Sequence, residues 1–277
     1  MRVSTVILPI YRWAEAAAVW RRAEELGCHA AYTYDHLSWR EPFRDGTWFG
    51  AVPTLTAAAT VTSRMRLGTM VTSPNFRHPV TLAKDLMSID DVSGGRLTVG
   101  IGAGTNGYDA GVFGGEPWSV RERADRFGEF VPLLDTVLRQ PVTTEPGRYY
   151  AAHEARMVPG CVQQPRIPLY VAATGPRGLA LTARYGQGWV TTAGEPADQL
   201  ARLAAACADA GRDPAELERV LLTGFGPEPD SLAGFVDLAG RYEQLGITEL
   251  VVHWPVPDSP FALDQGLFER MVTELSG

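Results

Sequence analysis

The sequence predicts a single (β/α)8 barrel that spans residues 1–277. Short apolar runs rich in β-branched residues alternate with amphipathic segments of helical length along the whole chain. Eight runs and eight segments are found in alternation, which is the number that closes such a barrel. Runs such as LYVAA and ELVVHW are almost continuously apolar, which is typical of a parallel sheet covered on both faces. A doubly wound open sheet uses the same alternation and is the alternative architecture.

Each strand of the predicted barrel is followed by a helix. The expected strands are Val3–Leu8, Ala30–Tyr34, Arg66–Val71, Leu97–Ile101, Leu169–Ala172, Gly188–Val190, Val220–Thr223 and Glu249–His253. The expected helices are 14–26, 53–62, 79–92, 120–138, 177–185, 196–210, 231–245 and 263–275. Three longer stretches, 35–50, 102–118 and 140–168, have neither pattern and are expected to be irregular insertions. The first two follow strands and belong to the carboxyl-terminal rim, where barrel enzymes place their chemistry.

Composition excludes several partners. The chain has 25 Lys and Arg residues against 32 Asp and Glu residues, a net charge of −7, so it lacks the basic footprint that nucleic acid requires. No apolar run approaches the roughly 20 residues that cross a membrane, and Pro9 interrupts the apolar amino terminus before it reaches signal-peptide length. The three cysteines, Cys28, Cys161 and Cys207, are far apart, so we expect free thiols and a cytoplasmic location.

Several catalytic chemistries are also excluded. Lys84 is the only lysine and lies within a predicted amphipathic helix, where a solvated or ion-paired role is expected. This argues against Schiff-base chemistry and pyridoxal phosphate, and no Walker A loop is present. The strand ends offer only Asp35 and Asp109 as acids, which are not evidently paired, so glycoside hydrolysis by two carboxylates is poorly supported. No cluster has metal-ligand spacing, and we expect no metal site.

The predicted rim does offer isolated hydrogen-bonding groups and bare backbone. His36, beside Asp35 at the end of the second strand, is the candidate catalytic residue, although a lone histidine is often structural. Gly102 and Gly104 follow the fourth strand and let a ligand approach the main chain. The segment ATGPRG opens a helix, where a phosphate would meet the free N–H groups of the helix start, the Thr174 hydroxyl and the Arg177 guanidinium. Thr174 as an ordinary helix cap is the alternative.

The substrate pocket is expected from the loops after the second, fourth and eighth strands. The loop 39–49 carries four large aromatic residues beside charges, and it either closes over an apolar or planar ligand or packs on the barrel. The residues assigned to this pocket are Trp39, Trp48, Phe49, Asn106, Asp109 and His253. His78, which precedes Pro79, is expected to cap a helix instead.

Residues 63–104, together with flanking motifs, resemble the bacterial luciferase-like superfamily of flavin- and F420-dependent oxidoreductases. The marks are YTYDHL, RHP after the third strand, the pattern DxxSGGRLxxGxGxG, AATGPRG and GQGWVTT, which occur in order over most of residues 1–192. The resemblance implies a luciferase-like TIM barrel with short insertions. It also implies a reduced FMN or, alternatively, the deazaflavin F420, bound at the carboxyl-terminal face and delivered by a separate flavin or F420 reductase. Members are often homodimers.

By position, the resemblance assigns His36 to the reactive edge of the cofactor ring. It assigns Met70, Val71 and Thr72 to a bulge in the third strand, where some members carry a non-prolyl cis peptide behind the ring. The remaining cofactor residues that it implies are Gly102, Gly104, Thr174, Gly175, Arg177 and Gly178.

Three functions follow from this resemblance. The leading hypothesis is a two-component, FMNH2-dependent monooxygenase that acts on a small organic substrate. The alternative is an F420-dependent reductase or dehydrogenase that transfers a hydride, and the second alternative is a barrel that binds flavin without turnover. F420-dependent sugar-phosphate dehydrogenases carry a glutamate soon after the strand-4 glycines. Here the region reads GTNGYD, with Asp109 as its nearest acid, which puts the sugar activity in doubt.

Overall fold

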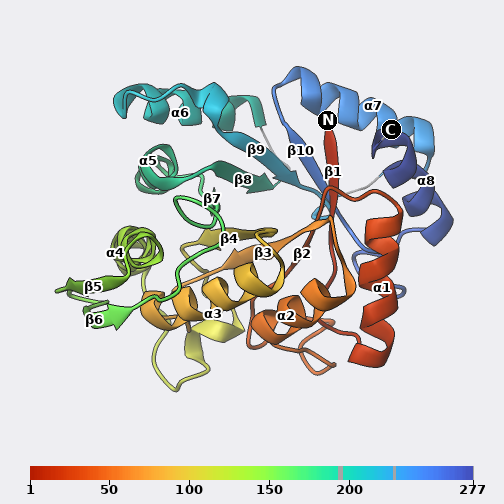
Figure 1. Cartoon of the computed structure of the whole chain (residues 1–277). Helices are drawn as coiled ribbons and strands as arrows, with labels where there is room; N and C mark the ends of the chain where they lie inside the picture. The colour runs from red at the N-terminus through yellow and green to blue at the C-terminus, as the bar shows by residue number, and fades with distance from the viewer. Residues whose placement is uncertain (193–195, 227–228, 277) are drawn as a thin grey trace.

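Eight parallel strands form a closed barrel in the computed structural model, which describes residues 1–192, 196–226 and 229–276 (Figure 1). Around the barrel the strands follow the order β1-β10-β9-β8-β7-β4-β3-β2, and all neighbouring pairs are parallel. Their bounds are β1 Arg2–Val6, β2 Ala30–Thr33, β3 Arg66–Thr72, β4 Leu97–Gly102, β7 Leu169–Ala172, β8 Gly188–Thr192, β9 Glu218–Leu222 and β10 Glu249–His253. The single (β/α)8 barrel is confirmed, and the open-sheet alternative is wrong.

A helix follows every barrel strand and covers its outer face. These helices are α1 Trp13–Glu25, α2 Ala51–Val61, α3 Pro79–Val92, α4 Val120–Arg139, α5 Pro176–Tyr185, α6 Pro196–Asp209, α7 Leu232–Gln244 and α8 Gln265–Ser276. All the predicted barrel strands and helices are present, and only their first and last residues differ from the prediction. The first strand, expected to run to Leu8, ends at Val6, although Ile7 and Leu8 remain buried before the chain turns at Pro9. The imidazole of His78 caps α3 as expected, accepting from Val80 N at 3.2 Å.

The stretch 140–168 is not wholly irregular, contrary to the prediction. It contains an antiparallel hairpin of β5 (Val142–Glu145) and β6 (Ala152–Arg156), beside the outer helix α4 (Figure 1). The β-branched residues of VTTE favour a strand, and a Cβ on Gly147 would collide with the Tyr150 carbonyl and with Glu129, so only glycine fits this turn. Two short 3-10 helices, η1 (Tyr108–Gly111) and η2 (Pro214–Glu216), were also missed.

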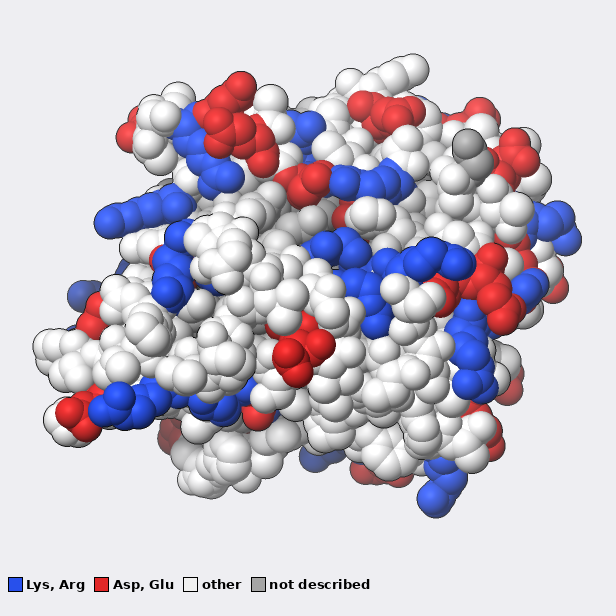
Figure 2. Space-filling view, viewed as in Figure 1, with Lys and Arg blue, Asp and Glu red and all other residues white. Residues whose placement is uncertain are grey.

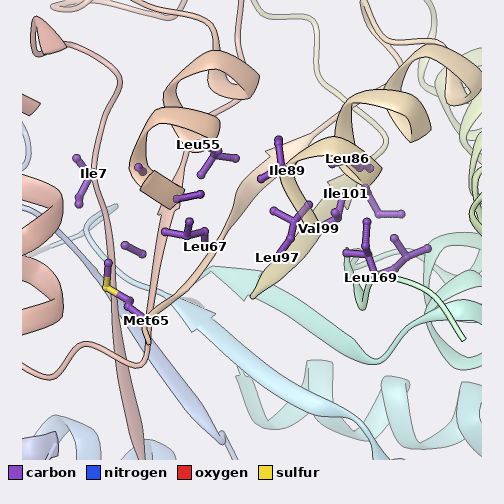
Figure 3. Packing of buried hydrophobic residues seen from close by; sticks show 14 of the residues in the cluster. Ile7, Leu55, Met65, Leu67, Leu86, Ile89, Leu97, Val99, Ile101 and Leu169 are labelled. Carbon is purple, nitrogen blue, oxygen red and sulfur yellow. The ribbon is translucent and has the colours of Figure 1, made fainter. Parts of the chain in front are cut away.

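The main core lies between the strands and the helices that cover them. Figure 3 shows side chains from β3 and β4 meeting those of α2 and α3, and Leu55, Leu67, Leu86 and Leu97 are fully buried there. Burial of one such leucine contributes roughly 1.5–3 kcal/mol. The core therefore fixes β3 and β4 relative to each other, and the ends of these strands form part of the carboxyl-terminal rim of the barrel.

The surface carries charges of both signs, as the composition leads us to expect. Basic and acidic side chains are interspersed on the face shown in Figure 2. The three cysteines are free, and Cys28 and Cys207 are buried. Lys84 donates to the Arg156 carbonyl at 2.7 Å at the protein surface. Within the described ranges, no helix is both long enough and apolar enough to cross a membrane.

Candidate active site

The candidate catalytic histidine is held by a buried carboxylate. His36 follows β2, and its Nδ1 hydrogen-bonds to Oδ2 of Asp109, which lies in η1 after β4. The other oxygen, Oδ1, accepts from the backbone N–H groups of Leu37 at 2.7 Å and Ser38 at 3.0 Å. Because the carboxylate fixes the proton on Nδ1, Nε2 of His36 is left free to accept a proton from a ligand. The His36 side chain is 29% exposed, so a ligand can reach it.

The sequence assigns Asp109 to the substrate pocket, but the structure places its carboxylate against His36. Its side chain is only 3% exposed, and its accepting positions are directed at His36 and at the backbone after β2. It positions the imidazole and is not a free acid of the pocket. The two residues are 73 positions apart, and no local pattern in the sequence pairs them.

The residue before the histidine forms a second buried contact. Asp35 is 2% exposed and accepts a bidentate pair of hydrogen bonds from the Arg77 guanidinium at 2.7 and 3.0 Å. It also accepts from the Thr72 hydroxyl at 2.6 Å. Asp35 thus ties the end of β2 to the end of β3 and is not available as a catalytic acid. Thr72, predicted to bind cofactor, is fully buried and has its hydroxyl committed to Asp35.

The end of β3 has the irregularity that the resemblance implies. The register between β3 and β4 shifts between Thr69 and Thr72, and the Met70–Val71 peptide is cis. Met70 is buried, whereas Val71 is half-buried and packs beside Gly102, whose Cβ would lie 3.0 Å from Val71 Cγ2. Gly104 has a φ of +76°, and a Cβ there would collide with the Asn75 side chain. The conformation of Gly104 thus favours glycine, whereas a side chain at Gly102 would crowd Val71, and both glycines leave bare backbone at the rim.

The predicted phosphate-binding segment begins α5, next to these glycines. Gly102 pairs in register with Ala172, and α5 starts four residues later. Its N-cap is Gly175 and not Thr174, and no side chain caps the helix. The N–H groups of the first turn are thus open to an anion. Gly178 packs closely on Ala173, since a Cβ there would lie 2.7 Å from the Ala173 Cβ.

Arg177, in the first turn of α5, already has a partner. Its guanidinium lies 2.7 Å from the Asp125 carboxylate of α4. Both side chains are partly exposed, at 55% and 31%, so the pair can rearrange toward an anion in the helix start. Any anion there competes with Asp125 for Arg177.

Aromatic side chains fill the rim near β2 and β10. Trp39 lies at the centre of this aromatic group, with its ring 5.3 Å from Phe43, 5.6 Å from Trp48 and 5.9 Å from Phe261. The Trp48 indole donates to the His36 carbonyl at 2.9 Å. The loop 39–49 thus packs on the barrel mouth in this structure. Phe49 is 42% exposed and forms no ring pair with another described aromatic residue.

His253 ends β10 and lies beneath this aromatic group. It is 3% exposed, its ring stacks on Phe261 at 3.7 Å, and its Nε2 lies 2.6 Å from the Tyr34 hydroxyl. Burial lowers the pKa of His253 from 6.5 to about 3, and the nearby Arg40 charge acts in the same direction. It is therefore enclosed, although the sequence assigns it to the substrate pocket. Asn106 is exposed, and its side-chain oxygen accepts from Arg123.

Two halves of the rim thus differ in chemistry. Glycines, the β3 bulge and an uncapped helix start follow β3, β4 and β7, whereas aromatic rings cover β2, β1 and β10. β7 and β1 stand opposite each other in the closed barrel. His36 lies at the border of the two halves. No group of three metal-ligating side chains occurs within the described residues.

The model of the luciferase-like monooxygenase family matches residues 2–225. The chain belongs to this family. Among curated relatives, an F420-dependent glucose-6-phosphate dehydrogenase of Beutenbergia cavernae is 33% identical over 218 residues, which cover 75% of this chain and 62% of the relative. An F420-dependent hydroxymycolic acid dehydrogenase of Mycobacterium tuberculosis is 33% identical over 203 residues, which cover 70% of this chain and 54% of the relative. The chain thus matches less than two thirds of the length of either enzyme.

Solved structures agree on the fold of this luciferase-like chain. An F420-dependent secondary alcohol dehydrogenase, solved with an F420–acetone adduct, has a TM-score of 0.82 and 20% identity over 99% of both chains. The F420-dependent tetrahydromethanopterin reductase of Methanopyrus kandleri has a TM-score of 0.81 and 19% identity over 99% of this chain and 97% of the reductase. At these identities the likeness establishes the barrel architecture.

Sequence reasoning missed several residues of this site. Arg77 was noticed only within the RHP motif, and Tyr34, Arg40 and Phe261 were not singled out. The available signal was position, because Tyr34 and Arg40 flank His36 in the same segment. Phe261 follows β10, whose carboxyl-terminal end lies at the same rim.

Proposed function

We propose that this protein is an F420-dependent oxidoreductase that transfers a hydride to or from a small organic substrate. The observation that carries the choice of cofactor is the activity of the two curated relatives, which are both F420-dependent dehydrogenases. These relatives favour the alternative reading of the sequence over the leading hypothesis of an FMNH2-dependent monooxygenase. The family match supports the monooxygenase only at the level of the superfamily.

The residues on the glycine side of the rim fit a flat ring that carries a phosphate. Val71 and Ala172 present small apolar surfaces beside the bare backbone of Gly102. The uncapped start of α5, with Gly175 and Arg177, lies next to this surface and suits an anion. These residues would hold the cofactor, and His36 would face its edge.

When bound, F420 supplies a two-electron carrier that accepts or donates a hydride without oxygen chemistry. His36 supplies the matching proton transfer. In the oxidative direction, Nε2 of His36 takes the proton that a substrate hydroxyl releases, and in the reductive direction it returns that proton to the oxygen. Asp109 keeps the imidazole in the tautomer that this requires and stabilises the imidazolium that forms.

We do not assign the substrates of the relatives to this chain. The GTNGYD segment lacks an early glutamate, and the nearest acid, Asp109, is buried against His36 and unable to act on a sugar. We therefore propose a small organic substrate other than a sugar phosphate. A separate F420 reductase or dehydrogenase that recycles the carrier, a homodimer and a cytoplasmic location are further parts of the proposal, and light scattering of the purified chain tests the dimer.

The deciding experiment is an anaerobic fluorescence titration of the purified chain with F420 and FMN, each in oxidised and reduced form. We expect F420 to bind at least tenfold tighter than FMN. Preferential binding of FMNH2 would overturn the proposal and restore the monooxygenase hypothesis. If neither compound binds, both cofactor assignments are wrong.

The role of His36 is tested separately. His36→Gln should keep the F420 affinity within about twofold while lowering hydride transfer by roughly 10²–10⁴, the range for general acid–base catalysis. The assay follows F420 absorbance with the first active member of a panel of small alcohols. His153→Gln, which changes an exposed histidine on β6, is the matched control. A rate that is unchanged in His36→Gln would show that His36 has no catalytic part.

A further inference from the structure

Arg40, in the loop after β2, is a cation held by aromatic rings. Its guanidinium carbon lies 5.1 Å from the centre of the Trp39 ring and 5.6 Å from that of Phe225, which follows β9. The side chain is exposed, and no carboxylate of the described residues forms an ion pair with it, although Glu41 is adjacent in the sequence. Cation–π contacts engage the face of a guanidinium and leave its N–H donors, which lie in its plane, unused.

This guanidinium lies at the same opening as the candidate catalytic residue. The Trp39 ring that carries Arg40 also lies 6.1 Å from the His36 ring and nearly parallel to it, so Trp39 borders both groups. The charge of Arg40 also acts on the buried groups of Tyr34 and His253 below the opening. Arg40 thus lies at the barrel mouth, against the same Trp39 ring that neighbours His36.

Its position also separates it from the proposed cofactor residues. The loop after β2 and Phe225 after β9 lie on either side of β1 and β10, the half of the barrel that carries the aromatic rings. The uncapped start of α5 follows β7, which is opposite β1. An anion bound by Arg40 therefore belongs to a molecule on the aromatic side of the mouth.

We propose that the substrate of this site is an anionic organic molecule with a largely apolar body, whose carboxylate or similar group is bound by Arg40. This rests on the proposed function, because it assigns the aromatic half of the same opening to the substrate. A planar anion accepts two parallel hydrogen bonds from one guanidinium, which fixes its orientation as well as its charge. The apolar body then packs against Trp39 and Phe225, the latter being 44% exposed.

The test compares benzoate with benzamide, which share a flat apolar body and differ in charge. Calorimetric titration of the full chain without cofactor should give benzoate a dissociation constant at least tenfold lower than benzamide. Arg40→Gln should reduce this preference to within about twofold, and Arg40→Lys should retain part of it because it keeps the charge without the planar fork. Arg64→Gln is the matched control, since Arg64 is an exposed arginine just before β3, at the amino-terminal end of the barrel.

The outcomes separate the two proposals. A wild-type chain without preference for benzoate, or an Arg40→Gln variant that keeps the full preference, would overturn the role of Arg40. F420 affinity that falls tenfold or more in Arg40→Gln would also overturn it, by assigning Arg40 to the cofactor. Failure of F420 to bind the wild-type chain would refute the proposed function alone, because the benzoate comparison is made without cofactor.

Discussion

The buried histidine below the barrel mouth predicts a specific loss of stability in mild acid. His253 is 3% exposed and stacked on Phe261, and burial lowers its pKa from 6.5 to about 3. The folded protein therefore keeps this imidazole neutral, with Nε2 able to accept from the Tyr34 hydroxyl at 2.6 Å. The unfolded chain takes up a proton near pH 6.5, so acid favours unfolding.

The sign and the size follow from linkage. A histidine with a depressed folded pKa contributes stability above its unfolded pKa and loses it as the pH falls from 6.5 toward 3. At pH 5 the loss assigned to His253 is about 2 kcal/mol, since the unfolded state is almost fully protonated there and the folded state is not. His29 contributes in an overlapping window, because partial burial lowers its pKa to about 4. The wild-type chain should therefore lose more stability than His253 alone explains.

The measurement is urea unfolding of the wild-type chain and of His253→Gln at pH 7.5, 6 and 5. His253→Gln should be less stable at pH 7.5, because it alters a buried stack, but its stability should fall between pH 7.5 and pH 5 by about 2 kcal/mol less than that of the wild type. His153→Gln controls for the removal of one exposed imidazole. Parallel falls of the wild type and His253→Gln, within about 0.5 kcal/mol, would refute the assignment of a neutral buried His253.

Four further substitutions test the contacts at the rim. Asp109→Asn should move the proton of His36 from Nδ1 to Nε2, because an amide N–H then faces Nδ1. ¹⁵N NMR of the imidazole detects this change without substrate, and an unchanged tautomer would contradict the positioning role of Asp109. Asp35→Asn should lower the free energy of unfolding by roughly 3 kcal/mol in urea, since it leaves the Arg77 guanidinium without its buried partner, and a loss below about 1 kcal/mol would contradict that reasoning. Arg177→Ala should weaken F420 binding by about 1.5 kcal/mol, whereas Asp125→Asn, which frees the same guanidinium, should strengthen F420 binding. If both variants change the F420 affinity in the same direction, the anion is bound elsewhere.

The fold was predictable because its signals are local. Runs such as LYVAA must be buried on both faces, and amphipathic segments such as 79–92 must cover them, so the alternation defines a barrel without any knowledge of contacts. The missed hairpin at 142–156 shows the limit of this reasoning. Its strands are four and five residues long and alternate poorly in burial, and their turn depends on the packing of Gly147 against Tyr150 and Glu129.

The site was only partly predictable, because its decisive contacts join distant segments. Position at a strand end was enough to select His36, but the carboxylate that holds it comes from a loop 73 residues later. The enclosure of His253 by Phe261 was also missed, although the two residues are close in sequence, since a histidine at a strand end has no local mark of being covered. Thr72 was chosen for its place in a motif, and its hydroxyl is used by Asp35.

The contacts of His36, Asp35, Asp109 and Arg40 can be understood together from the two chemically different halves of the rim. The proposed cofactor ring would need a flat surface and an anion seat, and the bare backbone of Gly102 beside Val71 and the uncapped start of α5 suit these two needs. A substrate that must be held against that ring needs groups that fix its orientation, and these come from the opposite half, where aromatic faces surround the guanidinium of Arg40. Asp35 and Asp109 both act on the short segment between the halves, one by joining β2 to β3 and the other by fixing the imidazole. Burying either carboxylate without a partner would cost free energy, so Asp35 is paired with Arg77 and Asp109 accepts from backbone N–H groups. Together these contacts stabilise the orientation of the His36 side chain.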